Sequence, residues 1–220
     1  MAYAHPDSAS FTRLMEQVES GHIKIPQFQR DFVWSKADSA KLIDSVIKGY
    51  PIGTFILWNT GERMRTVRNI GDLPLRETPM GQFTLQVLDG QQRLTSLFAS
   101  ARGAVIQREG RSERFDTIGI DLTADPTSDQ PVVLPERPEG RADDAWVSLM
   151  DLLGGGMALA SRYPQSLHTR LDTYARTFLQ TQFSVVTVHN APIEVATEIF
   201  TRLNVGGTRL TTCMLASRPS

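Results

Sequence analysis

The chain has 220 residues, of which 40% are hydrophobic and 21% charged, and its formal net charge is −1. These values are typical of a soluble globular protein with one sizeable core, and they exclude a global basic field for unspecific nucleic-acid binding. A single cysteine, Cys213, excludes an internal disulfide framework and a cysteine-based zinc cluster. We expect a cytoplasmic protein without a membrane partner, because no apolar stretch reaches about 18 residues and no signal-peptide pattern occurs.

The first ninety residues alternate between helix and strand signals. Apolar residues at helical spacing predict a helix over residues 10–20, followed by a short strand at 23–25. Ser35 with Asp38 three residues later predicts a helix start, and Gly49 predicts its end. Strands are predicted at 54–58 and 83–88, with an edge strand at 63–69.

The remainder continues this mixed order. A helix is predicted over residues 92–101, a strand over 118–122, a solvated loop or insertion over 123–144 and a glycine break at 154–156. A helix over 165–180, a strand over 183–188 and a final helix from Pro192 complete the chain. Because helices and strands do not alternate regularly, the predicted fold class is α+β, in a single domain spanning residues 1–220.

The most specific chemical signal lies at residues 87–95. An apolar strand there delivers Asp89 to its carboxyl end, and Gly90 permits a tight turn and the close approach of a ligand. The following helix offers free N–H groups and a positive dipole end to an anion. Asp89 is placed to hold a metal ion or to orient a water molecule.

Three side chains after this turn suit phosphate chemistry. Arg93 carries a fork of donors that matches phosphate oxygens, and Gln91 or Gln92 could position an attacking water molecule. The alternative interpretation is that Asp89 caps the helix and the three side chains are polar surface.

Two further segments accompany this one. Residues 25–34 read Ile-Pro-Gln-Phe-Gln-Arg-Asp-Phe-Val-Trp, and residues 200–207 read Phe-Thr-Arg-Leu-Asn-Val-Gly-Gly. Taken singly, the first could be a loop anchored in the core by its aromatic residues, and the second a helix C-cap.

Together and in this order, the three segments resemble the motifs of a known family. That family comprises the N-terminal domains of GmrSD-type modification-dependent restriction enzymes and of the phosphorothioate-sensing SspE proteins. The resemblance covers roughly residues 10–215, and three ordered motifs are far more specific than any one of them. Met214 departs from the family pattern, which usually has an acidic residue there.

The resemblance implies a mixed sheet with surrounding helices, similar to ParB and sulfiredoxin, and hydrolysis of GTP or UTP with Mg²⁺. The implied catalytic residues are Asp89, Gln91, Gln92 and Arg93, with Asp89 also as the metal ligand. The implied nucleotide-binding residues are Gly90, Arg93, Arg202, Asn204 and Gly207. The implied sensors of modified DNA are Pro26, Phe28, Gln29, Arg30 and Trp34.

The resemblance also implies the partners. We expect an anti-phage defence protein that recognises modified DNA and regulates a nuclease, located in cis or on a partner chain, with homo-oligomer formation. An apolar, aromatic rim beside one cation favours phosphorothioate, because sulfur is less strongly hydrated than the oxygen it replaces. The alternative is a DNA-modification-binding module whose nucleotide site is regulatory and not catalytic. The chain would be the N-terminal part of a longer protein.

Overall fold

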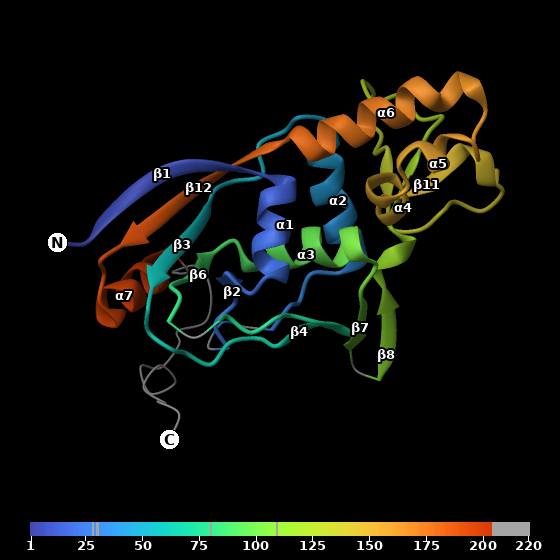
Figure 1. Ribbon diagram of the computed structural model, residues 1–220. Helices are drawn as coiled ribbons and strands as arrows, with labels where there is room; N and C mark the ends of the chain where they lie inside the picture. The colour runs from blue at the N-terminus through green and yellow to red at the C-terminus, as the bar shows by residue number, and fades with distance from the viewer. Residues whose placement is uncertain (28, 30, 80, 109, 204–220) are drawn as a thin grey trace.

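A mixed five-stranded sheet runs through the centre of the protein. The computed structural model describes residues 1–27, 29, 31–79, 81–108 and 110–203, coloured along the chain in Figure 1. The strand order is β1 (Tyr3–Ser10), β12 (Gln182–His189), β3 (Phe55–Thr60), β6 (Thr84–Asp89) and β2 (Ile23–Lys24). β12 pairs with β3 and β2 with β6 in parallel, and the other pairs are antiparallel. The predicted α+β class is confirmed.

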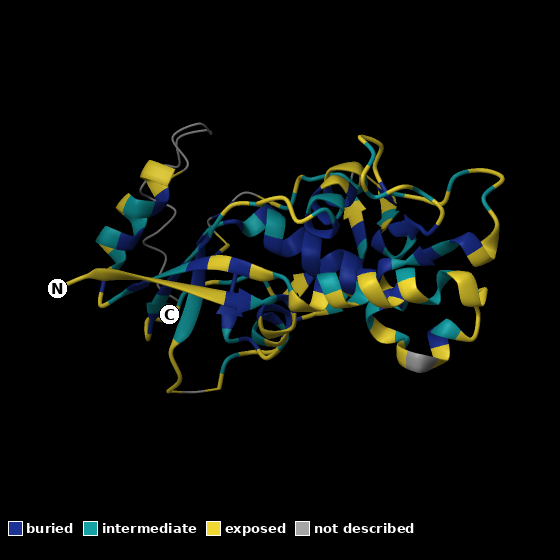
Figure 2. Cartoon of the chain, turned by 90° about the horizontal axis from the view of Figure 1, so that it is seen from above, coloured by how far each residue is buried: buried dark blue, intermediate teal, exposed yellow. Residues whose placement is uncertain are grey.

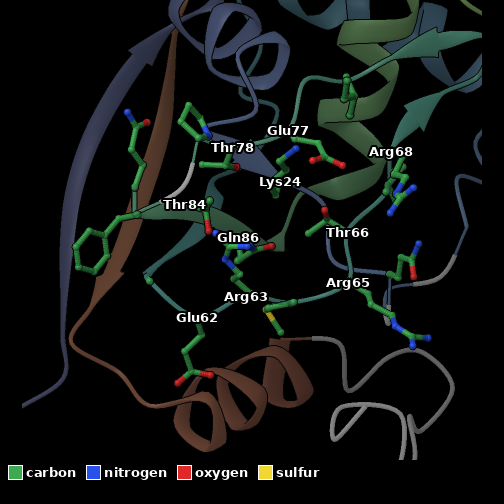
Figure 3. A pocket seen from close by; sticks show the side chains of 18 of the residues that line it. Lys24, Glu62, Arg63, Arg65, Thr66, Arg68, Glu77, Thr78, Thr84 and Gln86 are labelled. Carbon is green, nitrogen blue, oxygen red and sulfur yellow. Dashed lines mark hydrogen bonds between the residues drawn. The ribbon is translucent and has the colours of Figure 1, made fainter. Parts of the chain in front are cut away.

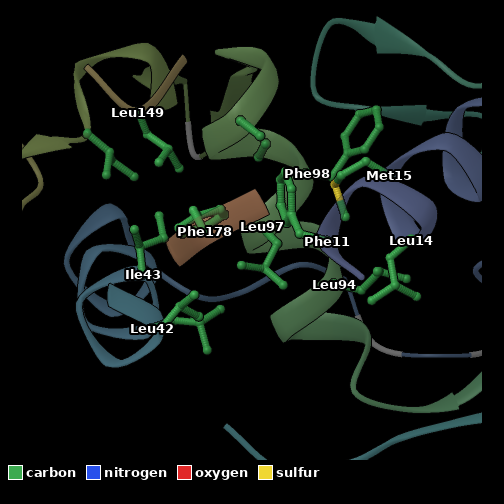
Figure 4. Packing of buried hydrophobic residues seen from close by; sticks show 14 of the residues in the cluster. Phe11, Leu14, Met15, Leu42, Ile43, Leu94, Leu97, Phe98, Leu149 and Phe178 are labelled. Carbon is green, nitrogen blue, oxygen red and sulfur yellow. The ribbon is translucent and has the colours of Figure 1, made fainter. Parts of the chain in front are cut away.

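The two faces of the sheet carry different cores, because side chains alternate along each strand. In β3, Phe55 and Leu57 belong to the larger core, whereas Trp58 belongs to the smaller one. The larger core is built with α1 (Phe11–Glu19), α2 (Lys36–Ile47), α3 (Gln91–Arg102) and α6 (Gln165–Gln180). Figure 4 shows how side chains from these helices interdigitate. The smaller core is covered by α7 (Ile193–Leu203), through Ala196 and Phe200.

A second group of short elements lies at the far end of α6 (Figure 1). It contains a three-stranded sheet in the order β10 (Val133–Leu134), β9 (Gly119–Asp121) and β11 (Trp146–Ser148), and the helices α4 (Leu149–Gly154) and α5 (Gly156–Ala160). Two small hairpins join β4 (Asn69–Ile70) to β5 (Leu73–Pro74) and β7 (Val105–Arg108) to β8 (Arg111–Arg114). Short 3₁₀ turns cover Phe115–Thr117 and Asp143–Ala145.

Burial follows this arrangement. Figure 2 shows buried residues gathered where the helices meet the sheet, while the outer loops and the first strand are exposed. No helix in the described ranges is long and apolar enough to cross a membrane.

Several predicted elements are confirmed, and two of the helices begin with side-chain caps. The side chain of Ser10 accepts from the backbone N–H of Arg13 at the start of α1. Ser35 and Asp38 form the predicted capping box at the start of α2. The glycine break is confirmed, since α4 ends at Gly154 and α5 begins at Gly156.

Other elements differ from the prediction. β1 and the β7–β8 hairpin are not predicted from the sequence, because both are largely polar and exposed. The edge strand predicted over residues 63–69 is wrong for most of its length. That segment makes one isolated bridge, between Thr66 and Pro26, and β4 begins only at Asn69.

The predicted solvated loop at residues 123–144 is only partly open to solvent. Val132 and Val133 are buried, and the carboxylate of Asp44 on α2 accepts from both of their backbone N–H groups. The acidic and proline-rich composition of this segment predicts exposure throughout, but part of the segment packs against the core through α2.

Candidate functional site

A tight turn at Gly90 connects β6 to α3. Gly90 has a φ of +95° and serves as the N-cap of α3 without any side-chain capping bond. A Cβ atom at this position would lie 2.6 Å from Cδ1 of Phe55, so both the conformation and the packing require glycine. The interpretation of Asp89 as the helix cap is therefore wrong. As the N-cap, Gly90 offers no side chain to the first N–H groups of α3.

The guanidinium of Arg93 ties the start of α3 to the start of β3. Its Nη1 donates to the carbonyl oxygen of Ile52 at 2.8 Å, and its Nη2 donates to that of Thr54 at 3.0 Å. Nη2 also donates to Oδ2 of Asp89 at 2.9 Å, and the group stacks 5.1 Å from the Phe55 ring centroid. The Asp89 side chain is 37% exposed and that of Arg93 only 16%. Arg93 therefore positions Asp89 from the protein side of the turn.

Gln92 joins the turn to the loop that follows β2. Its Oε1 accepts from the backbone N–H groups of Val33, at 2.9 Å, and Trp34, at 3.3 Å, and its Nε2 donates to the carbonyl oxygen of Asp31 at 3.0 Å. Gln92 is 7% exposed. The predicted polar-surface role does not apply to this residue, because its amide holds two motif segments together.

Gln29 also bonds a backbone group that is distant in the sequence, at the edge of the five-stranded sheet. Its side-chain Nε2 donates to the carbonyl oxygen of Val87 in β6, and the residue is buried. The backbone N–H of Leu85 in β6 donates to the carbonyl oxygen of His22, so the backbone groups of Leu85 point toward β2. Because the direction of backbone groups alternates along a strand, those of Val87, two residues later, point toward β2 as well. Since β2 ends at Lys24, Gln29 occupies the edge that the short strand leaves open.

A cavity of about 600 Å³ opens beside α3, and segments from the first two motifs line it. Gln27, Gln29, Asp31 and Phe32 come from the first motif, and Gln91 and Thr95 come from the second. Arg68 and Asn69 line it as well. Thr95 is 3% exposed, and its hydroxyl has no hydrogen-bond partner among the described residues.

Thr95 was not assigned a role from the sequence. Its spacing from Gln91 could have indicated a shared site, because residues four apart lie on the same face of a helix. The same spacing explains why Gln91 and Thr95 face this cavity while Gln92 and Arg93 face the protein.

The remaining predicted residues fall in three places. Pro26 is buried and bridges Thr66, and Trp34 is half-buried, with its carbonyl oxygen accepting from Arg108. Arg202 forms an exposed ion pair with Glu198 on α7 and is not among the residues lining the cavity. The predicted positions Phe28, Arg30, Asn204 and Gly207 lie outside the described residues.

The donor set near Asp89 suits only a metal ion that arrives with other ligands. Within the described ranges, no group of three His, Cys, Asp or Glu side chains could hold a metal ion. Mg²⁺ is usually held by one or two carboxylates together with waters and substrate phosphates. A partly exposed Asp89 fits that pattern.

Comparison with known proteins identifies the family. The model of the GmrSD restriction endonuclease N-terminal domain matches residues 11–215. A relative in Methanocaldococcus jannaschii, uncharacterized protein MJ0686, is 34% identical over 97 residues. That match covers 42% of this chain and 17% of the relative, so the chain spans less than a fifth of the relative's length. The chain belongs to the GmrSD restriction endonuclease N-terminal domain family.

Proposed function

We propose that this GmrSD-family domain binds GTP or UTP in the cavity beside α3 and hydrolyses it under the control of modified DNA, thereby regulating a nuclease. The observation that carries the proposal is the cavity itself. Two motifs about sixty residues apart line one space of about 600 Å³, within the range of small-molecule and cofactor sites.

The chemistry of the lining supports a phosphate-bearing ligand. The cavity lies against the first two turns of α3, at the helix end that favours anions. The Thr95 hydroxyl is buried and unpartnered among the described residues, so a ligand oxygen could satisfy it. Arg68 also lines this space and would supply a cation.

The contacts divide the proposed labour among the motif residues. Gln91 lines the cavity and would orient the attacking water. Asp89 does not line it, and would hold Mg²⁺ with the phosphates from the adjoining turn at Gly90. Gln92 and Arg93 act as positioning residues, since their side chains hold the loop backbone and Asp89. Magnesium would supply charge neutralisation on the transferred phosphoryl group.

We assign the reading of modified DNA to the side of the domain built around Pro26–Trp34, with phosphorothioate as the proposed mark. Pro26 is buried, Phe32 and Trp34 are half-buried, and Val33 is 54% exposed, so apolar surface is available there. Burying sulfur on such a surface forfeits less hydration than burying oxygen.

A second candidate function is a binding module whose nucleotide site is regulatory. The engagement of both Gln92 and Arg93 with protein groups favours it, because these two side chains are then not available to the nucleotide. Phosphate release separates the two candidates, since only the first requires turnover.

The decisive experiment measures GTP and UTP binding by calorimetry, and phosphate release, for the purified chain with Mg²⁺. Thr95→Val removes the unpartnered hydroxyl with little change in volume, and we expect nucleotide affinity to fall about 5- to 10-fold. Ser100→Ala is the matched control, because Ser100 is also buried on α3 with an unpartnered hydroxyl but does not line the cavity. Equal nucleotide affinity in Thr95→Val and the wild type would remove the proposed site.

A further inference from the structure

Figure 3 shows a larger cavity, of about 760 Å³. It shares Gln27, Val67 and Arg68 with the cavity beside α3. Three parts of the chain line it: Lys24 with Gln27, residues 61–68, and several residues between Leu75 and Gln86. The backbone of Gln27 donates to Arg65, and that of Val67 donates to Ile25, so the first motif holds one wall in place. Arg68, proposed above as a cation for the nucleotide, lines both cavities, whereas Asp89, Gln91, Gln92 and Arg93 do not line this one.

The floor of this cavity presents an unsatisfied acceptor. Gln86 is 2% exposed, and its Nε2 donates to Oγ1 of Thr84 at 2.9 Å. Its Oε1 is buried and has no hydrogen-bond partner among the described residues. Figure 3 shows Gln86 near the middle of the site, with Lys24 and Arg63 on either side. A buried amide oxygen without a partner is costly, and a ligand that donates a hydrogen there would remove the cost.

The rim carries uncompensated positive charge. Arg63, Arg65 and Arg68 make no ion pair and no side-chain hydrogen bond with another described residue. Ten other described arginines do have such partners: Arg93, Arg102, Arg108, Arg114, Arg137, Arg141, Arg162, Arg170, Arg176 and Arg202. Arg13, Arg76 and Arg111 lack such partners too, but none of them lines the cavity, so three guanidinium groups without partners on one short described segment distinguish this rim.

The other charged residues of the cavity do not cancel the rim. Lys24 donates to the carbonyl oxygen of Arg76, and burial lowers the pKa of its amine, an effect that Glu77 partly opposes. Glu62 and Glu77 are the acidic lining residues, against the three arginines and Lys24. The net charge of the lining is therefore positive. Phe83 is 62% exposed beside these groups and offers an apolar ring to a ligand.

We propose that this cavity takes one nucleotide of a DNA strand, with the base on Gln86 and Phe83 and the flanking phosphates on Arg63, Arg65 and Arg68. Oε1 of Gln86 needs a donor, which the exocyclic amino groups of cytosine, adenine and guanine supply with two hydrogens each, whereas thymine offers only its single ring N3–H. The inference rests on the proposed reading of DNA by this domain and locates where a nucleotide enters.

The spread of the arginines favours a strand over a free nucleotide. Three separate guanidinium groups stand on residues 63–68, and a strand offers one phosphate per nucleotide to them, whereas a free nucleotide carries its phosphates at one end only. Exposed aromatic rings that accept bases beside a basic track are typical of single-strand binding. A base inside a duplex would have to leave the stack, which costs least at mismatched or unpaired positions.

The test uses fluorescence anisotropy with the full chain and labelled 20-nucleotide strands, either oligo(dT) or oligo(dT) with one central dC. We expect the dC strand to bind more tightly, and Gln86→Met to abolish that preference with the salt dependence unchanged. Each of Arg63→Ala and Arg65→Ala should weaken binding to both strands alike and lower the slope of log Kd against log salt by about 0.7. Arg111→Ala is the matched control, an exposed arginine outside the cavity with no partner among the described residues.

Three outcomes overturn the inference. These are equal affinity for the two strands, an unaltered preference in Gln86→Met, and a salt slope that changes no more in Arg63→Ala than in Arg111→Ala. Competition by free dCMP as effective as the dC strand, per molecule, would assign the cavity to a free nucleotide instead. GTP binding measured on the same variants separates the proposals. If the wild type binds no GTP but shows the strand effects, only the proposal of GTP or UTP binding beside α3 fails. If the wild type binds GTP but shows no strand effects, only the proposal of a DNA nucleotide in the cavity around Gln86 fails.

Discussion

The side-chain oxygen of Gln92 accepts the backbone N–H of Val33 at 2.9 Å, across 59 positions of the sequence. This bond and its neighbours to Trp34 and Asp31 fix the first motif against the second. The cavity beside α3 has both motifs in its wall, so its shape depends on this one amide.

Replacing Gln92 by leucine should therefore destabilise the chain by roughly 2 kcal/mol, because the N–H groups of Val33 and Trp34 lose their acceptor. Urea unfolding followed by circular dichroism measures the change. Gln107→Leu is the control, since Gln107 is exposed and bonds only the side chain of Ser112, and it should stay within about 0.5 kcal/mol of the wild type. Similar losses in both variants would contradict the role of Gln92.

A second prediction compares two glycines with left-handed backbones. Gly53 has a φ of +87°, and a Cβ there would lie 2.7 Å from Nη1 of Arg93, whereas Gly49 has a φ of +72° and nothing within 4 Å. Alanine at either site should cost about 1–2 kcal/mol through backbone strain. Only Gly53→Ala should also displace Arg93 from the carbonyls of Ile52 and Thr54 and lower phosphate release severalfold. Phosphate release that falls equally in both variants would show that strain alone is responsible.

A third prediction concerns the helix caps and pH. Hydrogen bonds from Ser35, first from its side chain and then from its backbone, lower the pKa of Asp38 below its ordinary value of 3.8. The contribution of Asp38 to stability is therefore present above pH 3.8 and is lost as the pH falls through the lowered folded-state value. Ser35→Ala should cost about 1 kcal/mol at neutral pH, and this cost should shrink in acid.

Ser10→Ala provides the comparison for that experiment. Ser10 caps α1 in the same way, but the residue three positions later is Arg13, so no carboxylate titrates in the cap. Its cost should stay constant between pH 6 and acid conditions, by thermal unfolding. A pH-independent difference between the two variants would exclude the contribution of Asp38.

The fourth prediction concerns communication between the two cavities. Gln27, Val67 and Arg68 line both, so a ligand in one contacts the wall of the other. We expect the central-dC strand to change the Kd for GTP, and GTP to change the Kd for the strand, by the same factor, typically about 5- to 150-fold. Calorimetry in both orders of addition measures it. Independent binding, with both Kd values unaltered, would show that the shared wall transmits nothing.

Local patterns in the sequence determined much of this protein. The apolar spacing of α1 and the capping pair of Ser35 and Asp38 depend on neighbours a few residues away, so periodicity and cap chemistry predicted them. The same holds for the turn at Gly90, whose left-handed conformation the strand–glycine–helix order indicates. The three motif segments were likewise visible, although not how their side chains divide between protein and cavity.

Tertiary structure decided which groups meet. β1 is polar and nearly all exposed, and only its pairing with β12 makes it a strand. Gln92 and Gln29 look like free polar residues in the sequence, yet both bond backbone groups almost sixty positions away. The lining of the cavity around Gln86 comes from three separated stretches. Such contacts depend on how distant segments pack, and short-range spacing carries no information about a partner that the chain reaches only after it has folded.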